Sequence, residues 1–184
     1  GKYREALQLI KRENPFPAVC GRICNRRCED ACTRGTVDQA VAIDEVKRFI
    51  AQQDLNAETR FVPEKVIPKV DGEFSEKIAV IGGGPSGLSA AYYLALMGHK
   101  VTVYEKCAKL GGMLRYGIPN YRFPRHLLNA EIESILSLGI EVHTGVTVGK
   151  DIWIEDLQKE YDCLYIAIGA HQDKKTGIPG EDSV

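Results

Sequence analysis

The sequence lacks several features that would each identify a class of protein. No apolar run approaches the roughly 18 residues that a membrane span requires, and the amino terminus has no signal-peptide hydrophobic segment. The 24 lysine and arginine residues balance 25 aspartate and glutamate residues, and no basic stripe marks a nucleic-acid or anionic membrane surface. We therefore expect a cytoplasmic protein that binds neither nucleic acid nor membrane.

The patterns of common hydrolase and nucleotidase sites are also missing. No Ser-His-Asp or Cys-His set and no Walker loop is present. The four histidines, His99, His126, His143 and His171, share no metal-ligand spacing and are expected at the surface or at strand ends. Two features stand out instead: 18 glycines, and six cysteines of which four lie within thirteen residues.

The chain divides into three parts. Residues 1–55 hold two amphipathic helical patterns around a cysteine-rich segment, which predicts a small helical domain built on thiols. Residues 56–74 contain Pro63, Pro68 and Asp71-Gly72 without periodicity and are expected to be a linker. Residues 75–184 alternate strand-like with helical runs, which predicts an α/β fold with a parallel sheet.

The expected elements can be given by range. Strands are predicted at 77–81, 100–104, 140–143 and 162–168, and helices at 2–13, from 43, at 85–97, at 125–138 and around 154–160. The strand at 162–168 contains Cys163 and is predicted to be buried, where a small apolar side chain fits.

A glycine loop follows the first predicted strand and opens a helix. The sequence Gly82-Gly83-Gly84-Pro85-Ser86-Gly87 has the G-x-G-x-x-G form and the context of a dinucleotide-binding loop. In such loops Gly82 permits the tight turn, Gly84 lets the backbone approach a pyrophosphate, and Gly87 lets helix and strand pack closely. Glu105 ends the second strand, where a carboxylate bonds to a ribose diol and repels a 2′-phosphate. The expected adenosine moiety is that of FAD or NAD, not NADP.

The clustered cysteines follow the pattern C-x3-C-x3-C-x3-C. On a continuous helix, Cys20, Cys24, Cys28 and Cys32 would extend over about 18 Å, too far for one metal centre. The segment must therefore bend, and Gly21 and the run 25–27 provide the means. In a cytoplasmic chain such a motif favours metal over disulfides. Four thiolates suit an iron–sulfur cluster or structural zinc, the spacing favours the cluster, and an empty thiol loop is the third alternative.

A longer motif resembles a known family. The sequence Gly111-Gly112-Met113-Leu114-Arg115-Tyr116-Gly117-Ile118-Pro119, followed by Tyr121-Arg122-Phe123-Pro124, resembles the signature of the NADPH-dependent glutamate synthase small (beta) subunit. The resemblance runs from Asn14-Pro15-Phe16-Pro17 to Ile178-Pro179-Gly180-Glu181. Related flavin modules occur in dihydropyrimidine dehydrogenase and in NADH-oxidising subunits of larger complexes. The resemblance implies an incomplete, glutathione-reductase-like, Rossmann-like FAD-binding domain preceded by a small α-helical iron–sulfur domain.

The resemblance also implies which residues contact FAD. They are Gly82, Gly84, Pro85, Ser86 and Gly87 at the pyrophosphate, Glu105 and Lys106 at the ribose, Gly112, Met113 and Arg122 along the cofactor, Val148 at the adenine, and Gly169 at the end of the returning strand. Disulfide reductases of similar fold carry a cysteine pair soon after their Gly-Gly segment, and this chain has none there. Thiol–disulfide exchange at the flavin is not expected, and Cys107 and Cys163 are assigned to structure.

For the cysteines, the resemblance implies a [4Fe-4S] cluster on Cys20, Cys24, Cys28 and Cys32. The family's commoner form is C-x3-C-x5-C-x3-C, with a proline where this chain has Asn25. In that form another cysteine group precedes the motif, and this chain lacks that group. Cys20 is therefore the least secure ligand. Lys47 stands where a Gln or Glu of two-cluster relatives completes one cluster, which puts a second cluster in doubt.

The implied function is electron transfer. Complete relatives carry a second domain for NAD(P)H and pass electrons through FAD and clusters to a large catalytic subunit or another redox partner. This chain is expected to be a fragment, inactive alone and without a catalytic side chain, because the cofactors supply the redox chemistry. Two alternatives remain open: an NADH-oxidising subunit of a formate dehydrogenase or hydrogenase complex, and a zinc-stabilised docking module.

Overall fold

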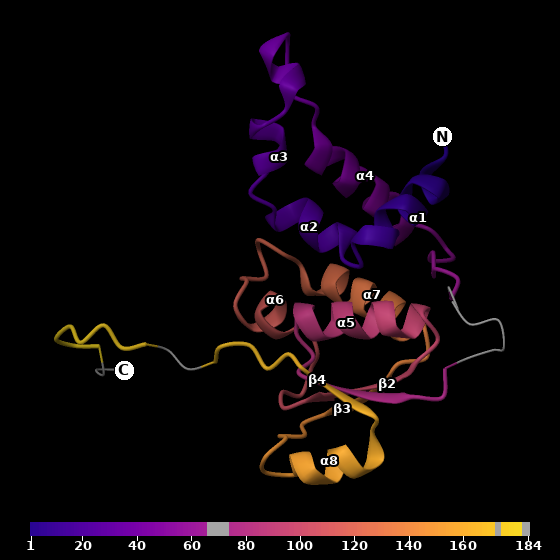
Figure 1. Cartoon of the computed structure of the whole chain (residues 1–184). Helices are drawn as coiled ribbons and strands as arrows, with labels where there is room; N and C mark the ends of the chain where they lie inside the picture. The colour runs from indigo at the N-terminus through magenta and orange to yellow at the C-terminus, as the bar shows by residue number, and fades with distance from the viewer. Residues whose placement is uncertain (66–73, 172–173, 182–184) are drawn as a thin grey trace.

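A helical segment precedes a parallel sheet in the computed structural model, which describes residues 1–65, 74–171 and 174–181 (Figure 1). The first segment contains α1 (Tyr3–Glu13), α2 (Pro17–Ile23), α3 (Arg27–Asp30), the 3-10 turn η1 (Thr33–Thr36) and α4 (Ile43–Leu55). Pro17 begins α2, as its fixed φ and missing N–H favour at a first helical position. None of the described helices is long and apolar enough to cross a membrane.

The second segment forms the predicted α/β fold. Its strands are β1 (Lys77–Ile81), β2 (Lys100–Glu105), β3 (Glu141–Thr144) and β4 (Cys163–Ile166), and its helices are α5 (Pro85–Leu96), α6 (Gly112–Tyr116), α7 (Arg125–Leu136) and α8 (Ile154–Glu160). The described strands pair in parallel in the order β3-β2-β1-β4. The predicted Rossmann-like class is confirmed.

Both faces of the sheet are covered, as Figure 1 shows. Successive strand residues point to opposite faces, and Val80 packs with α5 and α7 while its neighbours Ala79 and Ile81 pack with Leu157 of α8. β1 and β2 are therefore buried at consecutive positions, which is typical of a parallel sheet covered on both sides.

The strand β4 differs from its prediction as a buried strand. Cys163 is exposed, and Tyr165 and Ile166 are 41% and 62% exposed. In the described part of the chain β4 lies at the edge of the sheet and pairs only with β1. An edge position leaves its outer side without a neighbour, so the apolar run indicated the strand but not its burial.

The cysteine segment bends, as its spacing requires, within the predicted run 25–27 and not at Gly21. α2 ends at Ile23, Cys24 is extended, and Arg26 adopts the left-handed conformation with φ 58°. Gly21 lies inside α2, where an added Cβ would come within 2.8 Å of the Arg48 Cβ. Gly21 therefore allows α2 to pack closely on α4 and does not make the bend.

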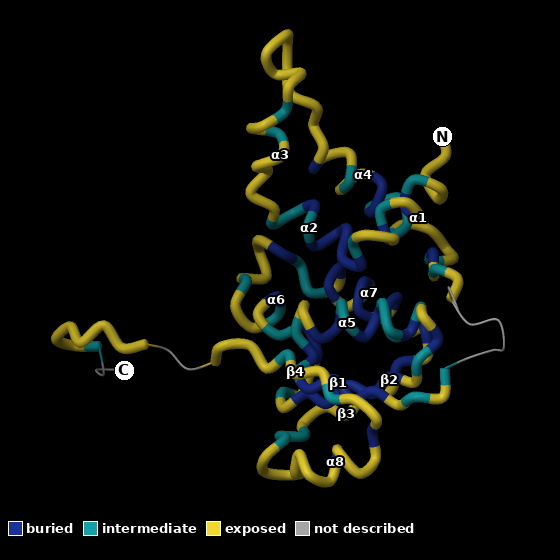
Figure 2. The backbone as a smooth tube through the Cα atoms, in the orientation of Figure 1, coloured by how far each residue is buried: buried dark blue, intermediate teal, exposed yellow. Residues whose placement is uncertain are grey.

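The two segments share one hydrophobic core. Phe16 and Val19 belong to the same buried cluster as Tyr92 of α5 and Leu128 of α7. Figure 2 shows buried backbone continuing from α2 into α5 and α7. Phe61, from the predicted linker, packs against α1 and α4. Pro68 and Asp71-Gly72 of that linker lie outside the described residues, and the domain boundary near residue 74 stays a prediction.

Candidate functional site

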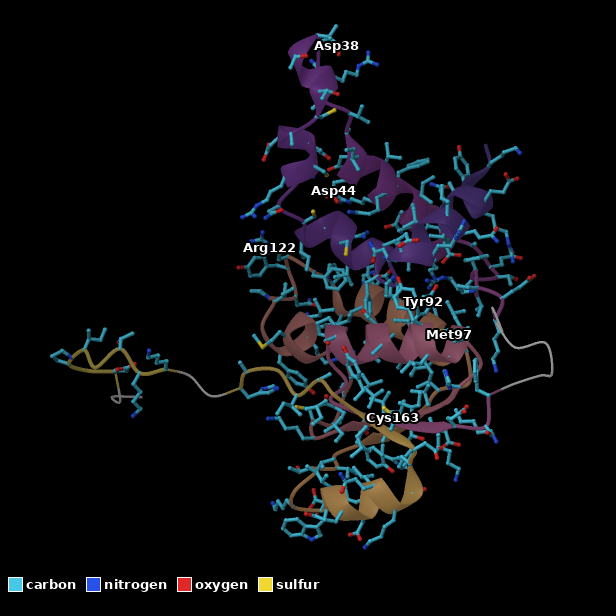
Figure 3. The ribbon with its side chains drawn as sticks, in the orientation of Figure 1. Asp38, Asp44, Tyr92, Met97, Arg122 and Cys163 are labelled. Carbon is cyan, nitrogen blue, oxygen red and sulfur yellow. The ribbon has the colours of Figure 1, made fainter. Side chains whose placement is uncertain are left out.

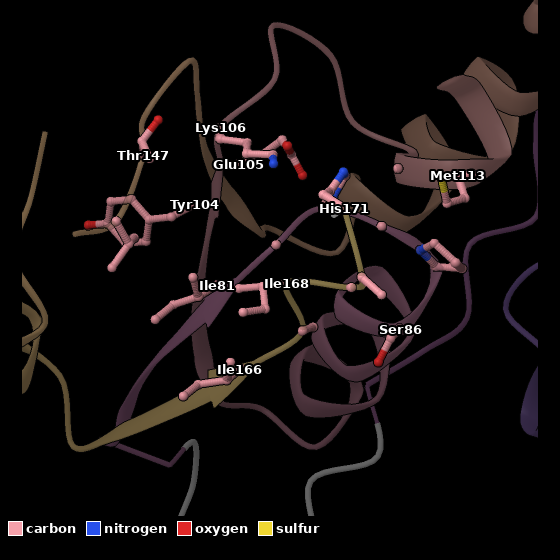
Figure 4. Close-up of a pocket in the computed structure, with 18 of the residues that line it drawn as sticks. Ile81, Ser86, Tyr104, Glu105, Lys106, Met113, Thr147, Ile166, Ile168 and His171 are labelled. Carbon is pink, nitrogen blue, oxygen red and sulfur yellow. The ribbon is translucent and has the colours of Figure 1, made fainter. Parts of the chain in front are cut away.

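A cavity of about 450 Å³ opens at the carboxyl ends of β1, β2 and β4 (Figure 4). Ligands of open parallel sheets bind at this edge. Ten of the predicted cofactor residues line the cavity: Gly82, Gly84, Pro85, Ser86, Glu105, Lys106, Gly112, Met113, Val148 and Gly169. Figure 4 shows Ser86 of α5 on one side of this space and Tyr104 and Thr147 on another.

The glycine loop makes one wall of the cavity. Gly82 has φ +110°, and its N–H donates to the Tyr104 carbonyl at 2.8 Å. At Gly84 an added Cβ would have no heavy atom nearer than Gly112 Cα at 3.7 Å, so the space in front of this residue is open. Gly84 precedes α5, and no side chain caps that helix. The N–H groups of its first turn are thus available to an anionic ligand.

Gly87 has a packing role in this loop. An added Cβ there would lie 1.9 Å from the Gly82 carbonyl oxygen and 3.1 Å from Val80 Cγ1. Gly87 is not among the residues that line the cavity. It lets α5 approach β1, the role expected of the third glycine, and its predicted contact with the cofactor stays a prediction.

Glu105 holds the glycine loop at the end of β2. The residue is 6% exposed, its Oε2 accepts the Gly83 N–H at 2.7 Å, and its Oε1 accepts the Cys107 N–H at 2.8 Å. Both carboxylate oxygens thus order backbone around the cavity that Glu105 also lines. An acceptor-only carboxylate suits both these N–H donors and the predicted ribose hydroxyls.

Changing Glu105 to Gln is expected to loosen the loop. Glutamine has one acceptor oxygen where glutamate has two. Its NH2 group would therefore face one of the two backbone N–H groups that Glu105 accepts in the native protein, and that N–H would lose its partner. Leaving a buried donor unpaired costs about 1–3 kcal/mol, and the free energy of unfolding measured in urea should fall by about that amount. Glu155→Gln, at an exposed position of α8, is the matched control. An equal stability for both variants would contradict the role given to Glu105.

Arg122 lies outside the cavity lining, whereas His171 lies in it. Figure 3 shows Arg122 on the loop between α6 and α7, away from the sheet. Arg122 is exposed and does not line the cavity, so its contact with the cofactor stays a prediction. His171, expected at the surface or at a strand end, is exposed and also lines the cavity.

Further lining residues were missed by sequence reasoning. They are Ile81, Tyr104, Val146, Thr147, Ile166, Ala167, Ile168, Ala170 and His171. All of them lie at the carboxyl end of a strand or in the segment that follows β3 or β4. Their positions after predicted strands were the available signal, because those ends meet at one edge of a parallel sheet.

The four cysteines of the thiol segment have different surroundings. The Arg26 N–H donates to the Cys24 sulfur at 3.5 Å. Backbone N–H groups of Val41, Arg34 and Gly35 lower the pKa of Cys32. The Cys20 thiol instead donates to Asn14 Oδ1 at 3.7 Å, and burial raises its pKa.

Lys47 is close to the first two thiols. Its ammonium lies 2.7 Å from Asp44 Oδ1, and its charge acts on Cys20 and Cys24. An ammonium has three donors and no acceptor, so Lys47 offers iron no ligand atom. Lys47, the residue of α4 that acts on these thiols, therefore supplies a positive charge and does not complete a cluster.

The fit of the two implied cofactors rests on different observations. For FAD, the open space at Gly84 and the uncapped start of α5 provide a cradle for a pyrophosphate. For an iron–sulfur cluster, N–H groups directed at the Cys24 and Cys32 sulfurs suit thiolates. No three His, Cys, Asp or Glu side chains within the described ranges are grouped closely enough to hold a metal ion. The donor chemistry thus fits a cluster, while the ligand set stays a prediction.

Two domain families match the chain. Residues 1–59 match the family described as dihydropyrimidine dehydrogenase domain II, 4Fe-4S cluster. Residues 80–129 match the family described as NAD(P)-binding Rossmann-like domain. The first match contains all four clustered cysteines, and the second contains the glycine loop and Glu105.

Several known proteins are similar. The beta subunit of NADP(+)-dependent formate dehydrogenase from Moorella thermoacetica is 40% identical over 99% of this chain and 28% of its own length. The small chain of NADPH glutamate synthase from Bacillus subtilis is 34% identical over 100% of this chain and 36% of its own. FprA from Mycobacterium tuberculosis, solved in complex with NADPH, has a TM-score of 0.52 and 26% identity over 58% of this chain and 25% of its own. The chain thus spans about a third or less of the length of these proteins.

Proposed function

We propose that this homologue of the glutamate synthase small subunit and of related NADPH oxidoreductase beta subunits binds FAD and an iron–sulfur cluster in an electron-transfer flavoprotein. Electrons would pass from NAD(P)H through FAD to a partner subunit in the cytoplasm. The observation that carries the proposal is the cavity at the strand ends, which gathers ten residues expected at FAD and leaves the space before Gly84 open.

The residues of this chain bind and orient the cofactors. The N–H groups at the start of α5 meet the pyrophosphate, Gly84 allows its close approach, and Glu105 holds both the loop and the ribose. Cys24, Cys28 and Cys32 supply thiols of the cluster site, and Cys20, whose pKa is raised by burial, is the least secure of the four predicted ligands. When bound, FAD accepts a hydride from the nicotinamide and the cluster carries single electrons. No side chain of the described part is required as an acid or base for these steps.

The partner is proposed at the level of its class. The relatives are named as small or beta subunits, which favours a larger subunit that performs the substrate chemistry. A glutamate synthase large subunit and a formate dehydrogenase or hydrogenase complex both fit. Assays with glutamine and 2-oxoglutarate, and with formate, on the full-length protein and its co-purified partner would separate these two.

An absorption spectrum tests the proposed function. The full-length protein is purified without oxygen, incubated with FAD and freed of excess by gel filtration. We expect flavin bands with a broad iron–sulfide shoulder, together with iron and acid-labile sulfide by chemical analysis. Zinc without iron would contradict the cluster and favour the zinc-stabilised docking module. A colourless protein with neither metal would contradict both cofactor assignments.

A further inference from the structure

A buried carboxylate of α7 holds the start of α2. Glu131 is 3% exposed, its Oε1 accepts the Ala18 N–H at 2.8 Å, and its Oε2 accepts the Val19 N–H at 2.8 Å. The first N–H groups of a helix have no partner within that helix, and no side chain of its own N-cap residue serves α2. Glu131 therefore pairs donors that would otherwise be buried without a partner.

The same face of α7 also holds α1. Ser134 lies one turn after Glu131, and its Oγ accepts the Lys11 ammonium at 2.9 Å. Lys11 is 3% exposed and donates to the Phe61 carbonyl at 3.3 Å, while the Tyr92 hydroxyl donates to the Lys11 carbonyl at 2.9 Å. Burial raises the pKa of Glu131 to about 7, against the lowering effects of its two N–H bonds and of Lys11. We call Glu131, Lys11 and Ser134 the α7 clamp.

The α7 clamp belongs to a chain of contacts that connects the first thiols with the cofactor cavity. On one side, α2 carries Cys20, and Cys24 follows its last residue. On the other side, α7 is bonded to α6, since the Arg125 guanidinium donates to the Leu114 carbonyl at 3.1 Å. α6 contributes Met113 to the lining of the cavity. A displacement of α2 on α7 would thus change the separation between the thiols and the cavity.

We propose that Glu131 is a positioning residue that fixes the thiol-bearing helix α2 relative to the flavin cavity for electron transfer between the two cofactors. The proposal rests on the function proposed above. In each transfer reduced flavin loses one electron and the cluster gains it. The protons of the reduced flavin pass to solvent, and the electron passes on to the redox partner. Glu131 takes no part in the redox step and acts only through the position of α2.

The test compares two residues of one helix in the full-length protein. Glu131→Gln keeps the volume but places an NH2 group against a backbone N–H. Glu133→Gln changes an exposed carboxyl of the same helix and is the control. The double variant Glu131→Gln with Lys11→Met removes both buried charges, so it provides a folded alternative if the single variant does not fold.

Two measurements are made on each protein. Hydrogen exchange of the amides of residues 18–23 should be about 5- to 150-fold faster in the Glu131 variants, the range expected when a buried N–H bond is lost. After mixing with NADPH or NADH, the flavin should be reduced at the wild-type rate while the cluster absorbance bleaches more slowly. The Glu133 variant should match wild type in both measurements.

The outcomes separate the positioning role from a structural one. Suppose that the α2 amides of a variant exchange faster but its cluster is reduced at the wild-type rate. That result would overturn the proposal, because α2 would be loosened without any effect on electron transfer. Unchanged amide exchange in every Glu131 variant would overturn it as well. A wild-type protein that binds neither flavin nor iron would instead overturn the proposed function. This outcome is read from the wild-type protein alone and is therefore distinct from a failure at Glu131.

Discussion

Replacing Gly84 by alanine is expected to lower the retention of FAD while leaving the protein folded. The added Cβ would meet no protein atom closer than 3.7 Å, and the backbone at Gly84, with φ −81°, accepts any residue. The methyl group would occupy the space through which a pyrophosphate approaches the loop. Overpacking of this kind costs about 1–3 kcal/mol, which weakens binding roughly 5- to 150-fold. The flavin-to-protein ratio after gel filtration measures the loss.

Gly87→Ala is the contrasting variant in the same loop. Its Cβ would lie 1.9 Å from the Gly82 carbonyl oxygen, so α5 must move away from β1. We expect a loss of about 3 kcal/mol in the free energy of unfolding, visible in a thermal melt before any ligand is added. A Gly84 variant that keeps its FAD, or one that melts as early as the Gly87 variant, would contradict the placement of the pyrophosphate.

The sequence predicted the elements of the fold better than their surroundings. The strands at 77–81 and 100–105 and the helix at 85–96 agree with prediction to within one residue, because each is a run of β-favouring or helix-favouring residues bounded by glycine or another turn signal. α6 was not predicted, since five residues show none. The exposure of β4 depends on which strands flank it, and a run of apolar residues cannot report that.

The bend of the thiol segment shows the same limit. Spacing required the segment to turn, and the turn occurs at Arg26, a residue of the predicted run 25–27 in the left-handed conformation. Side chains such as arginine rarely adopt this conformation, so residue type did not single out Arg26 within that run. Gly21, the other residue expected to allow the bend, instead packs against Arg48.

The cavity was predictable where a motif fixed both residue type and position. Gly84 and Glu105 follow from the dinucleotide-binding pattern, and the resemblance to the glutamate synthase small subunit, confirmed by the relatives, added Gly112 and Met113. His171 was missed because reasoning about histidines considered only spacing along the chain. Its place in the cavity results from the sheet order, which brings the end of β4 beside the glycine loop.

Single serine substitutions in the thiol segment are expected to divide its cysteines into two groups. Iron binds to the thiolate and not the thiol, and backbone N–H groups lower the pKa of Cys32. The Cys24 sulfur accepts the Arg26 N–H, a type of bond that also forms to the sulfurs of iron–sulfur sites. Cys28 is exposed and, like Cys32, follows the Arg26 turn in the chain. We expect Cys24→Ser, Cys28→Ser and Cys32→Ser each to remove nearly all iron and acid-labile sulfide from protein prepared without oxygen.

Cys20→Ser is expected to retain most of the iron. Its thiol donates to Asn14 Oδ1, and burial raises its pKa, so the proton that a ligand must lose is held in place. Cys163→Ser, on the exposed edge strand β4, serves as the control for the loss of a cysteine elsewhere. Equal iron loss in all four thiol-segment variants would make Cys20 a ligand after all. That result would require the sulfurs of Cys20 and Cys24 to reach one metal centre together. The Cys20 sulfur would then have to leave Asn14, and α2 would have to rotate.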